Sequence, residues 1–169
     1  LSTGALFILV GMLYERRHTR AIADFGGIAK SMPVYAAFFV IITLSSIGLP
    51  GTNGFVGEFL ILLGAFMTEG RTIYAIFAAT GIVLAAVYML WMVQRVFFGP
   101  LTSPENEGLS DLSAREVVAM VPILVFVFFI GLFPKPFLDR MDQAVAVKEL
   151  RKAGTSKQAA APTHVIRAA

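Results

Sequence analysis

The chain has 169 residues, of which 57% are hydrophobic and 15% charged, and a soluble domain, with about 25% charged residues, could not bury so much apolar side chain. It has no cysteine, which excludes a disulfide, a zinc knuckle and an iron–sulfur site on this chain. The net charge of +3 comes from basic residues that flank apolar segments, which is typical of membrane edges and not of nucleic-acid-binding surfaces. We therefore predict an all-α, polytopic transmembrane helix bundle that contacts the lipid bilayer and no nucleic acid.

The first apolar segment covers residues 1–14 and ends at a polar, basic stretch over residues 15–20. It carries neither an initiator methionine nor the charged start of a signal peptide. A segment of about fourteen residues is too short to cross a bilayer core of about 30 Å. We therefore expect the sequence to begin inside a helix.

The second apolar segment begins at residues 31–33, where Ser31 is a candidate N-cap and Pro33 lies in the first turn. It is apolar to Leu49 and resumes at Phe55, after an interruption that disfavours a continuing helix. The pattern indicates either one discontinuous helix or two short ones, and we favour the discontinuous helix because the second half is too short to cross alone. The interrupting residues are Pro50, Gly51, Thr52, Asn53 and Gly54.

Two further apolar segments follow, over about residues 72–99 and 117–133, so that about four membrane segments are expected in all. A polar loop over residues 100–115 connects them. We assign residues 1–140 to the membrane domain and residues 141–169, which are polar and rich in alanine and lysine, to a partly disordered C-terminal tail.

This topology distributes the basic residues over both sides of the membrane. Arg71 and the seven Lys and Arg residues after Arg115 fall on one side, so the charge count alone decides the orientation poorly. The basic residues expected on the other side, which we take as cytoplasmic, are Arg16, Arg17, Arg20, Lys30, Arg95 and Arg115.

Glu58 is the one charged residue between Lys30 and Glu69. A carboxylate at bilayer depth costs about 2.5–3.5 kcal/mol and indicates a functional role by default. Irregular backbone at that depth must be buried in protein or hydrated, and Glu58 is expected in about the first turn of the half-helix that follows the interruption. The position suits a proton relay. The alternative is that Glu58 satisfies the half-helix N-terminus or pairs with a basic residue of a helix outside this chain.

Thr80 and Tyr88 are weaker candidates, because they lie eight residues apart and so on a similar face of the third segment. They could hold water or a proton wire, although ordinary hydrogen bonding between helices is the simpler explanation. The sequence contains no phosphate-binding loop, no metal-binding spacing of histidines and no Ser-His-Asp arrangement. We therefore expect no self-contained catalytic site and no cofactor on this chain.

Three strings together carry a family resemblance: Leu1 to Gly11, Tyr14 to Arg20, and Gly48 to Phe59, which reads GLPGTNGFVGEF. They resemble the M subunits (chain 4) of respiratory NADH-quinone oxidoreductase, complex I, over about residues 1–140. Looser versions of the third string occur in the related L and N subunits and in Mrp-type cation/proton antiporters. Those proteins commonly have a lysine in place of the carboxylate, so Glu58 favours the M type.

The resemblance implies that this chain is the last four helices of a fourteen-helix, antiporter-like subunit in the cell inner (plasma) membrane. It implies that Glu58 is the terminal proton-relay carboxylate, and that the other relay residues lie upstream of this chain. It also implies a translocase in which flavin, iron–sulfur clusters and quinone bind partner subunits, with the L and N subunits as membrane neighbours. The alternatives are an Mrp-type antiporter subunit, a subunit of a membrane-bound hydrogenase, or a scaffold without an ion path.

Overall fold

A computed structural model of the chain describes residues 1–101 and 103–141, and all regular structure within these residues is helical. The chain divides into two compact units, Leu1–Phe133 and Pro134–Ala169, and in the second unit residues 135–141 are helical. The predicted tail, residues 141–169, lies outside the described residues except for Met141. The elements of the first unit are α1 (Ser2–Arg17), η1 (Ile22–Asp24), α2 (Ile28–Ser31), α3 (Pro33–Ser46), α4 (Asn53–Met67), α5 (Thr72–Phe97), η2 (Pro104–Asn106) and α6 (Ala114–Leu132).

Two helices of the first unit, α5 and α6, are long and apolar enough to cross a membrane. With 26 and 19 residues, they extend over about 39 and 28 Å. The helices α3 and α4 are also apolar but have only 14 and 15 residues, so neither spans about 30 Å alone. The predicted all-α membrane fold, with one interrupted apolar segment, is confirmed.

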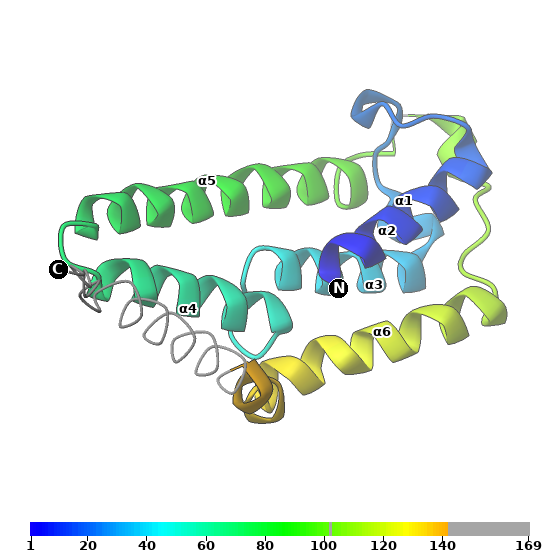
Figure 1. Cartoon of the computed structure of the whole chain (residues 1–169). Helices are drawn as coiled ribbons and strands as arrows, with labels where there is room; N and C mark the ends of the chain where they lie inside the picture. Colours follow the sequence, from blue (N-terminus) through cyan, green and yellow to red (C-terminus); the bar gives the residue numbers. More distant parts are fainter. Residues whose placement is uncertain (102, 142–169) are drawn as a thin grey trace, which may run out of the picture. The chain divides into compact units, whose positions relative to one another are not determined.

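The interrupted segment lies at the centre of the first unit, with α3 and α4 following one another along the same direction (Figure 1). The long helix α5 packs against both of them, and α6 packs against α4, α3 and α1. The helix α1 packs chiefly against α3. Other helices therefore contact both halves of the interrupted segment, while Leu49 and Pro50 of the interruption itself are exposed.

The core of this unit lies around α3, where α1, α5 and α6 contribute large, fully buried side chains. The hydroxyl of Tyr35 on α3 donates to the carbonyl of Leu9 on α1 at 2.9 Å. The rings of Tyr35 and Phe97 stack with centroids 5.9 Å apart, and the Phe39 and Phe97 centroids are 4.7 Å apart. By contrast, α4 contains no buried residue, so its outer surface is available to lipid or to further protein.

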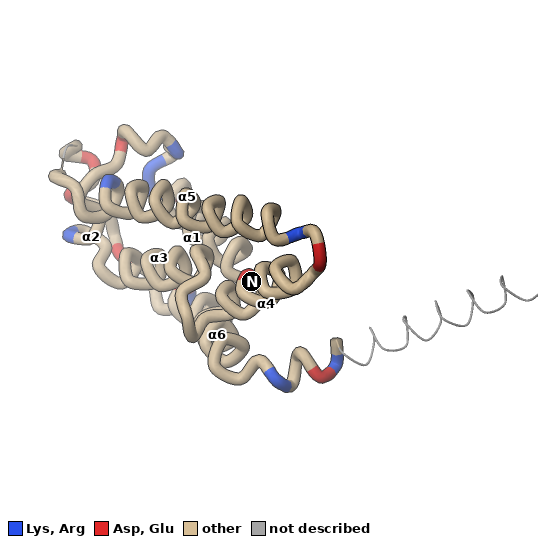
Figure 2. Tube along the Cα trace, turned by 90° about the vertical axis from the view of Figure 1, so that its left-hand side faces the viewer, with Lys and Arg blue, Asp and Glu red and all other residues tan. Residues whose placement is uncertain are grey.

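Charged residues gather at the ends of the helices and are nearly absent from their middles (Figure 2). Contacts between distant segments identify the residues of one end: Arg16 pairs with Glu116, and Arg17 pairs with Glu105. Glu69 and Arg71 lie in the short α4–α5 connection at the opposite end. Arg16 and Arg17 therefore lie at one end of the helices and Arg71 at the other, while the assignment of these ends to the two sides of a membrane stays a prediction.

The N-terminus of α3 corrects one sequence-based expectation, that Ser31 is its N-cap. Ser31 belongs to α2 and donates its hydroxyl to the carbonyl of Asn106 at 2.6 Å. The N-cap of α3 is Met32, which has no capping side chain, and Pro33 begins the helix as predicted. The carboxylate of Asp111, from the α5–α6 loop, accepts hydrogen bonds from the backbone N–H groups of Val34 and Tyr35 at 2.8 and 3.0 Å. A distant loop thus supplies the missing cap.

Replacing this cap tests whether the loop stabilises α3. We expect Asp111→Ala to lower the free energy of unfolding by about 1 kcal/mol, because two first-turn N–H groups of α3 lose their acceptor. For a protein of this size that is a decrease of about 2–4 °C in the thermal midpoint, measured in mild detergent. Glu107→Ala removes an exposed carboxylate of the same loop and should leave the midpoint unchanged. Equal midpoints for both variants would contradict the capping role.

Candidate functional site

The candidate site is the break, defined here as residues 47–52 between the end of α3 at Ser46 and the start of α4 at Asn53. Gly48 and Gly51 adopt positive φ angles of 76° and 91°, which glycine reaches without steric cost. The N–H groups of Leu49 and Thr52 donate to the carbonyls of Leu44 and Leu49 at 3.0 and 3.1 Å. An interruption is found where predicted, but Asn53 and Gly54, which were expected to belong to it, form the start of α4. The break satisfies part of its backbone hydrogen bonding internally.

The helix α6 closes one side of the break. A Cβ atom placed on Gly131 of α6 would collide with the backbone of Gly51 and Thr52, so a residue with a side chain would force the two elements apart. Thr52 is buried, and its hydroxyl donates to the carbonyl of Leu49 at 2.6 Å. This hydroxyl is therefore used within the break and does not cap α4.

Glu58 is the sixth residue of α4 and lies in its second turn, not in the first turn as expected. Its side chain reaches back toward the break, because a Cβ atom on Gly48 would collide with Oε2 of Glu58. Glu58 is half-buried. Within residues 1–101 and 103–141 its carboxylate neither caps α4 nor pairs with an arginine or lysine. The site therefore combines a carboxylate with an adjacent, irregular stretch of backbone.

A cluster of polar side chains, with two buried serines and a partly exposed asparagine, joins three elements beside the break, and we call it the serine–asparagine cluster. It consists of Ser2 on α1, Ser45 on α3 and Asn53 at the start of α4. The hydroxyls of Ser2 and Ser45 are 2.8 Å apart, and each lies 2.9 Å from Oδ1 of Asn53, to which it can donate. The cluster therefore ties both halves of the interrupted helix to α1.

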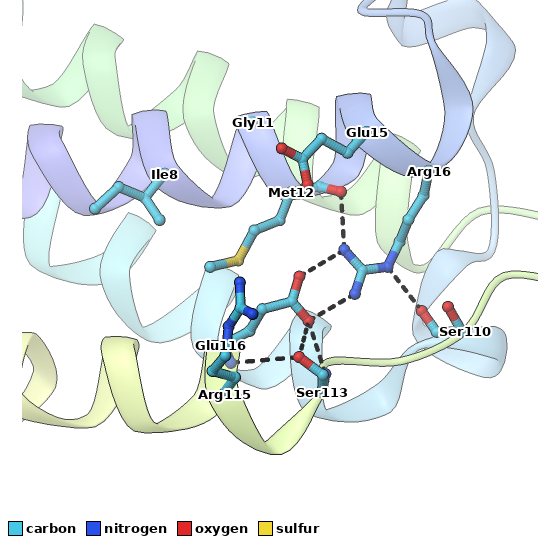
Figure 3. A pocket seen from close by; sticks show the side chains of 9 residues that line it. All are labelled: Ile8, Gly11, Met12, Glu15, Arg16, Ser110, Ser113, Arg115 and Glu116. Carbon is cyan, nitrogen blue, oxygen red and sulfur yellow. Dashed lines mark hydrogen bonds and ion pairs between the residues drawn. The ribbon is translucent and has the colours of Figure 1, made fainter.

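A second polar site lies at the charged end, in a groove of about 800 Å³ between α1 and the start of α6 (Figure 3). Arg16 extends from α1 and donates to both carboxylate oxygens of Glu116 at 2.9 and 2.7 Å. Its Nε also donates to the carbonyl of Ser110 at 3.0 Å. Glu116 forms a capping box with Ser113 at the start of α6. The arginine thereby fixes the end of α1 to the first turn of α6.

Among residues 1–101 and 103–141, no hydrogen bond joins Thr80 or Tyr88 to Glu58. The hydroxyl of Thr80 donates to the carbonyl of Phe77 in its own helix at 2.7 Å. Tyr88 is 60% exposed in this chain. Their role as a water or proton wire stays a prediction. No group of three potential metal ligands is found among the described residues.

Sequence reasoning did not identify the serine–asparagine cluster or the Arg16–Glu116 pair. Ser113 and Glu116 have the spacing of a capping box, and that signal could have located the start of α6. No local signal relates Ser2 to Ser45, which lie 43 positions apart. Such contacts depend on how the helices pack.

Comparison with known proteins places the break and Glu58 in a family. Residues 1–85 match the transmembrane family described as NADH:quinone oxidoreductase/Mrp antiporter. NADH-quinone oxidoreductase subunit M of Rhodobacter capsulatus is 43% identical over 144 residues, which cover 85% of this chain and 28% of that protein. The subunit M of Mycobacterium tuberculosis (strain ATCC 25618 / H37Rv) is 42% identical over 145 residues, covering 86% and 26%.

A solved structure agrees with these sequence relatives. A chain in the structure of respiratory complex I from Thermus thermophilus with bound NADH matches this fold with a TM-score of 0.72 and 37% sequence identity. The match covers 79% of this chain and 27% of that chain. The chain thus spans little more than a quarter of the length of the curated relatives it matches.

The Arg16–Glu116 pair can be tested against the second ion pair at the same end. We expect Glu116→Ala to lower the free energy of unfolding by about 1–2 kcal/mol, because Arg16 loses two charge-assisted hydrogen bonds and α6 loses its capping box. Glu105→Ala removes the partner of Arg17, whose side chain is 11% exposed against 71% for Glu105. Arg17 keeps its contact with the carbonyl of Asp24 at 3.5 Å, so we expect a smaller loss, below about 1 kcal/mol. Thermal midpoints in mild detergent measure both. A larger loss for Glu105→Ala would contradict this assignment.

Proposed function

This chain belongs to the NADH:quinone oxidoreductase/Mrp antiporter transmembrane family, and from that premise we propose that it is part of a proton-translocating membrane subunit of NADH-quinone oxidoreductase. The names of the relatives support the oxidoreductase branch of the family, since they are NADH-quinone oxidoreductase M subunits at 42–45% identity. The structural neighbour, a chain of respiratory complex I, supports the same branch.

The proposed role of this chain in translocation rests on one observation, the carboxylate of Glu58 beside the break. Inserting a titratable group at bilayer depth costs free energy, so such a group indicates a functional role. Its neutral and charged forms become comparable in free energy when water or protein dipoles reach it. Within a helix the backbone N–H and C=O groups bond one another, whereas the break leaves some of these groups available to water or to Glu58. Glu58 can therefore load a proton from one side and release it to the other.

Electron transfer belongs to other subunits in this proposal. The chain has no cysteine, so no cysteine-ligated iron–sulfur cluster can bind to it. We propose that flavin, iron–sulfur clusters and quinone bind partner subunits, that the membrane neighbours include the antiporter-like L and N subunits, and that the complex lies in the plasma membrane. The enzyme activity is then that of the assembled NADH:quinone oxidoreductase, to which this chain contributes proton translocation.

Substitution of Glu58 in the full-length subunit of the assembled complex tests the relay. Glu58→Gln preserves size and hydrogen bonding but cannot titrate, so proton pumping per NADH oxidised should fall at least about tenfold. Glu58→Asp retains a carboxyl group and should keep partial pumping if a water molecule bridges the shorter side chain. Proton uptake by membrane vesicles, normalised to assembled complex, measures both.

The matched control is Glu69→Gln, since Glu69 is an exposed glutamate outside the helices. It should pump as the wild type does. Wild-type pumping by Glu58→Gln would show that the carboxylate is structural and that no proton passes through it.

The identity of the assembly has a separate test. Full-length subunit purified in mild detergent should bring with it polypeptides that carry flavin and iron–sulfur clusters, identified by absorbance and mass spectrometry. Recovery with antiporter subunits alone, without flavin or iron, would overturn the oxidoreductase assignment and favour an Mrp-type antiporter.

A further inference from the structure

We propose that Asn53 is a positioning residue, which holds Glu58 at the break by locking the start of α4 to Ser45 of α3 and Ser2 of α1. The inference rests on the proposed relay role of Glu58 and assigns the residues that keep it in place. Asn53 itself need not carry a proton. It acts through the position of the helix that bears Glu58.

The first observation is the geometry of the serine–asparagine cluster. Its three oxygen–oxygen contacts measure 2.8, 2.9 and 2.9 Å, and they join α1, α3 and α4 at one point. The side chain of Ser45 is wholly buried, and Ser2 is 6% exposed. The two hydroxyls are almost inaccessible to water, whereas Asn53 is partly exposed, so breaking the cluster leaves two buried hydroxyls short of a hydrogen-bond partner. The arrangement is therefore costly to disrupt.

The chemistry of the three side chains makes Asn53 the centre of the cluster. Two hydroxyls carry two donor protons, and the amide oxygen of Asn53 can accept from both. When both protons go to Asn53, its amide oxygen is the shared acceptor, and the 2.8 Å contact between the two hydroxyls carries no hydrogen bond of its own. Removal of the Asn53 amide leaves the two serines with only each other. The link to α4 is then lost, although α1 and α3 stay connected through the serine pair.

The second observation connects this link to Glu58. Close backbone packing continues beside the cluster, because a Cβ atom on Gly54 would collide with the carbonyl oxygen of Ser45. Glu58 follows on the same helix and touches Gly48 of the break. An α-helix transmits a shift of its first turn to its second, so displacement at Asn53 moves the Glu58 carboxylate relative to Gly48. Placement errors of about 1 Å can cost a catalytic group up to about 100-fold in rate.

The charged end of the same chain offers matched controls. Asn106 is wholly buried like Ser45, and its Nδ2 donates to the carbonyl of Asp24 at 3.1 Å. Ser31 donates to the carbonyl of Asn106 at 2.6 Å. Asn106→Ala and Ser31→Ala therefore remove an asparagine and a serine from a hydrogen-bonded cluster that lies far from Glu58. These two variants measure how much pumping is lost when a buried hydrogen-bonded cluster is broken at a distance from Glu58.

The experiment measures proton pumping per NADH oxidised, as a function of pH, in membrane vesicles that contain the assembled complex. We expect Asn53→Ala to reduce pumping about tenfold and to shift the pH of half-maximal pumping, because the surroundings of Glu58 change. Ser45→Ala should reduce it less, since Ser2 still donates to Asn53. Asn106→Ala and Ser31→Ala should pump normally for each assembled complex. The proposal would be overturned if Asn53→Ala pumped as many protons per NADH oxidised as the wild type with the same pH profile. It would also be overturned if Asn106→Ala and Ser31→Ala lost as much pumping as Asn53→Ala.

A disulfide tests the contact even if Asn53→Ala fails to assemble. Ser2→Cys with Ser45→Cys places two thiols where two oxygens lie 2.8 Å apart, and an S–S bond of about 2.05 Å needs only a small approach. A mild oxidant that removes two electrons and two protons should crosslink the pair within the complex, and the crosslink itself is the readout, because both substitutions also remove the donors to Asn53. Absence of the crosslink would show that α1 and α3 are not held together at this point, and would overturn the cluster on which the proposal rests.

These outcomes are distinct from failure of the proposed relay. If Glu58→Gln pumps as the wild type, the relay role itself is wrong. If Glu58→Gln is inactive while Asn53→Ala pumps normally with an unshifted pH profile, the relay stands and the positioning role is wrong. Reduced pumping with a shifted profile in Asn53→Ala, together with an inactive Glu58→Gln, supports both.

Discussion

The constraint on which the rest of this structure depends is that backbone N–H and C=O groups inside a bilayer must find partners within the protein. Ending α3 at Ser46 and starting α4 at Asn53 frees such groups in the middle of an apolar segment. Internal hydrogen bonds of Leu49 and Thr52 satisfy some of them. Packing of α6 through Gly131 shields the break, and Glu58 approaches it from α4. The break is thus a built feature that places a carboxylate beside irregular backbone.

The chain holds its helices together in two chemically different ways. At the charged end, Arg16, Glu116 and Asp111 connect α1, α3 and α6 through charge-assisted hydrogen bonds. Beside the break, the connections are made by the neutral side chains of Ser2, Ser45 and Asn53. Charged pairs would be expensive at bilayer depth, whereas hydroxyl and amide groups can bind one another there at lower cost. Glu58 lies beside the break and carries a charge, but it forms neither kind of connection between helices. A structural role therefore does not explain it.

Much of the fold could be predicted from the sequence because it depends on apolar segment lengths and on punctuation by Pro50 and Gly51. The same pattern located Glu58 next to the break, although the helix starts at Asn53 and puts Glu58 in its second turn. The N-cap of α3 could not be predicted, because the acceptor is Asp111, 77 residues beyond Val34. The cluster of Ser2, Ser45 and Asn53 could not be predicted for the same reason. Serine and asparagine are common residues, and these three come together only because α1, α3 and α4 pack against one another.

The central claim is that the Glu58 carboxyl group changes protonation during proton transfer. Infrared difference spectroscopy of the assembled complex, recorded between resting and NADH-oxidising states, detects this change as a carboxylic acid C=O band that appears or disappears. The account predicts such a band in the wild type, shifted in Glu58→Asp and absent in Glu58→Gln. A Glu58 that stays in one protonation state while the wild-type complex pumps protons would contradict the account.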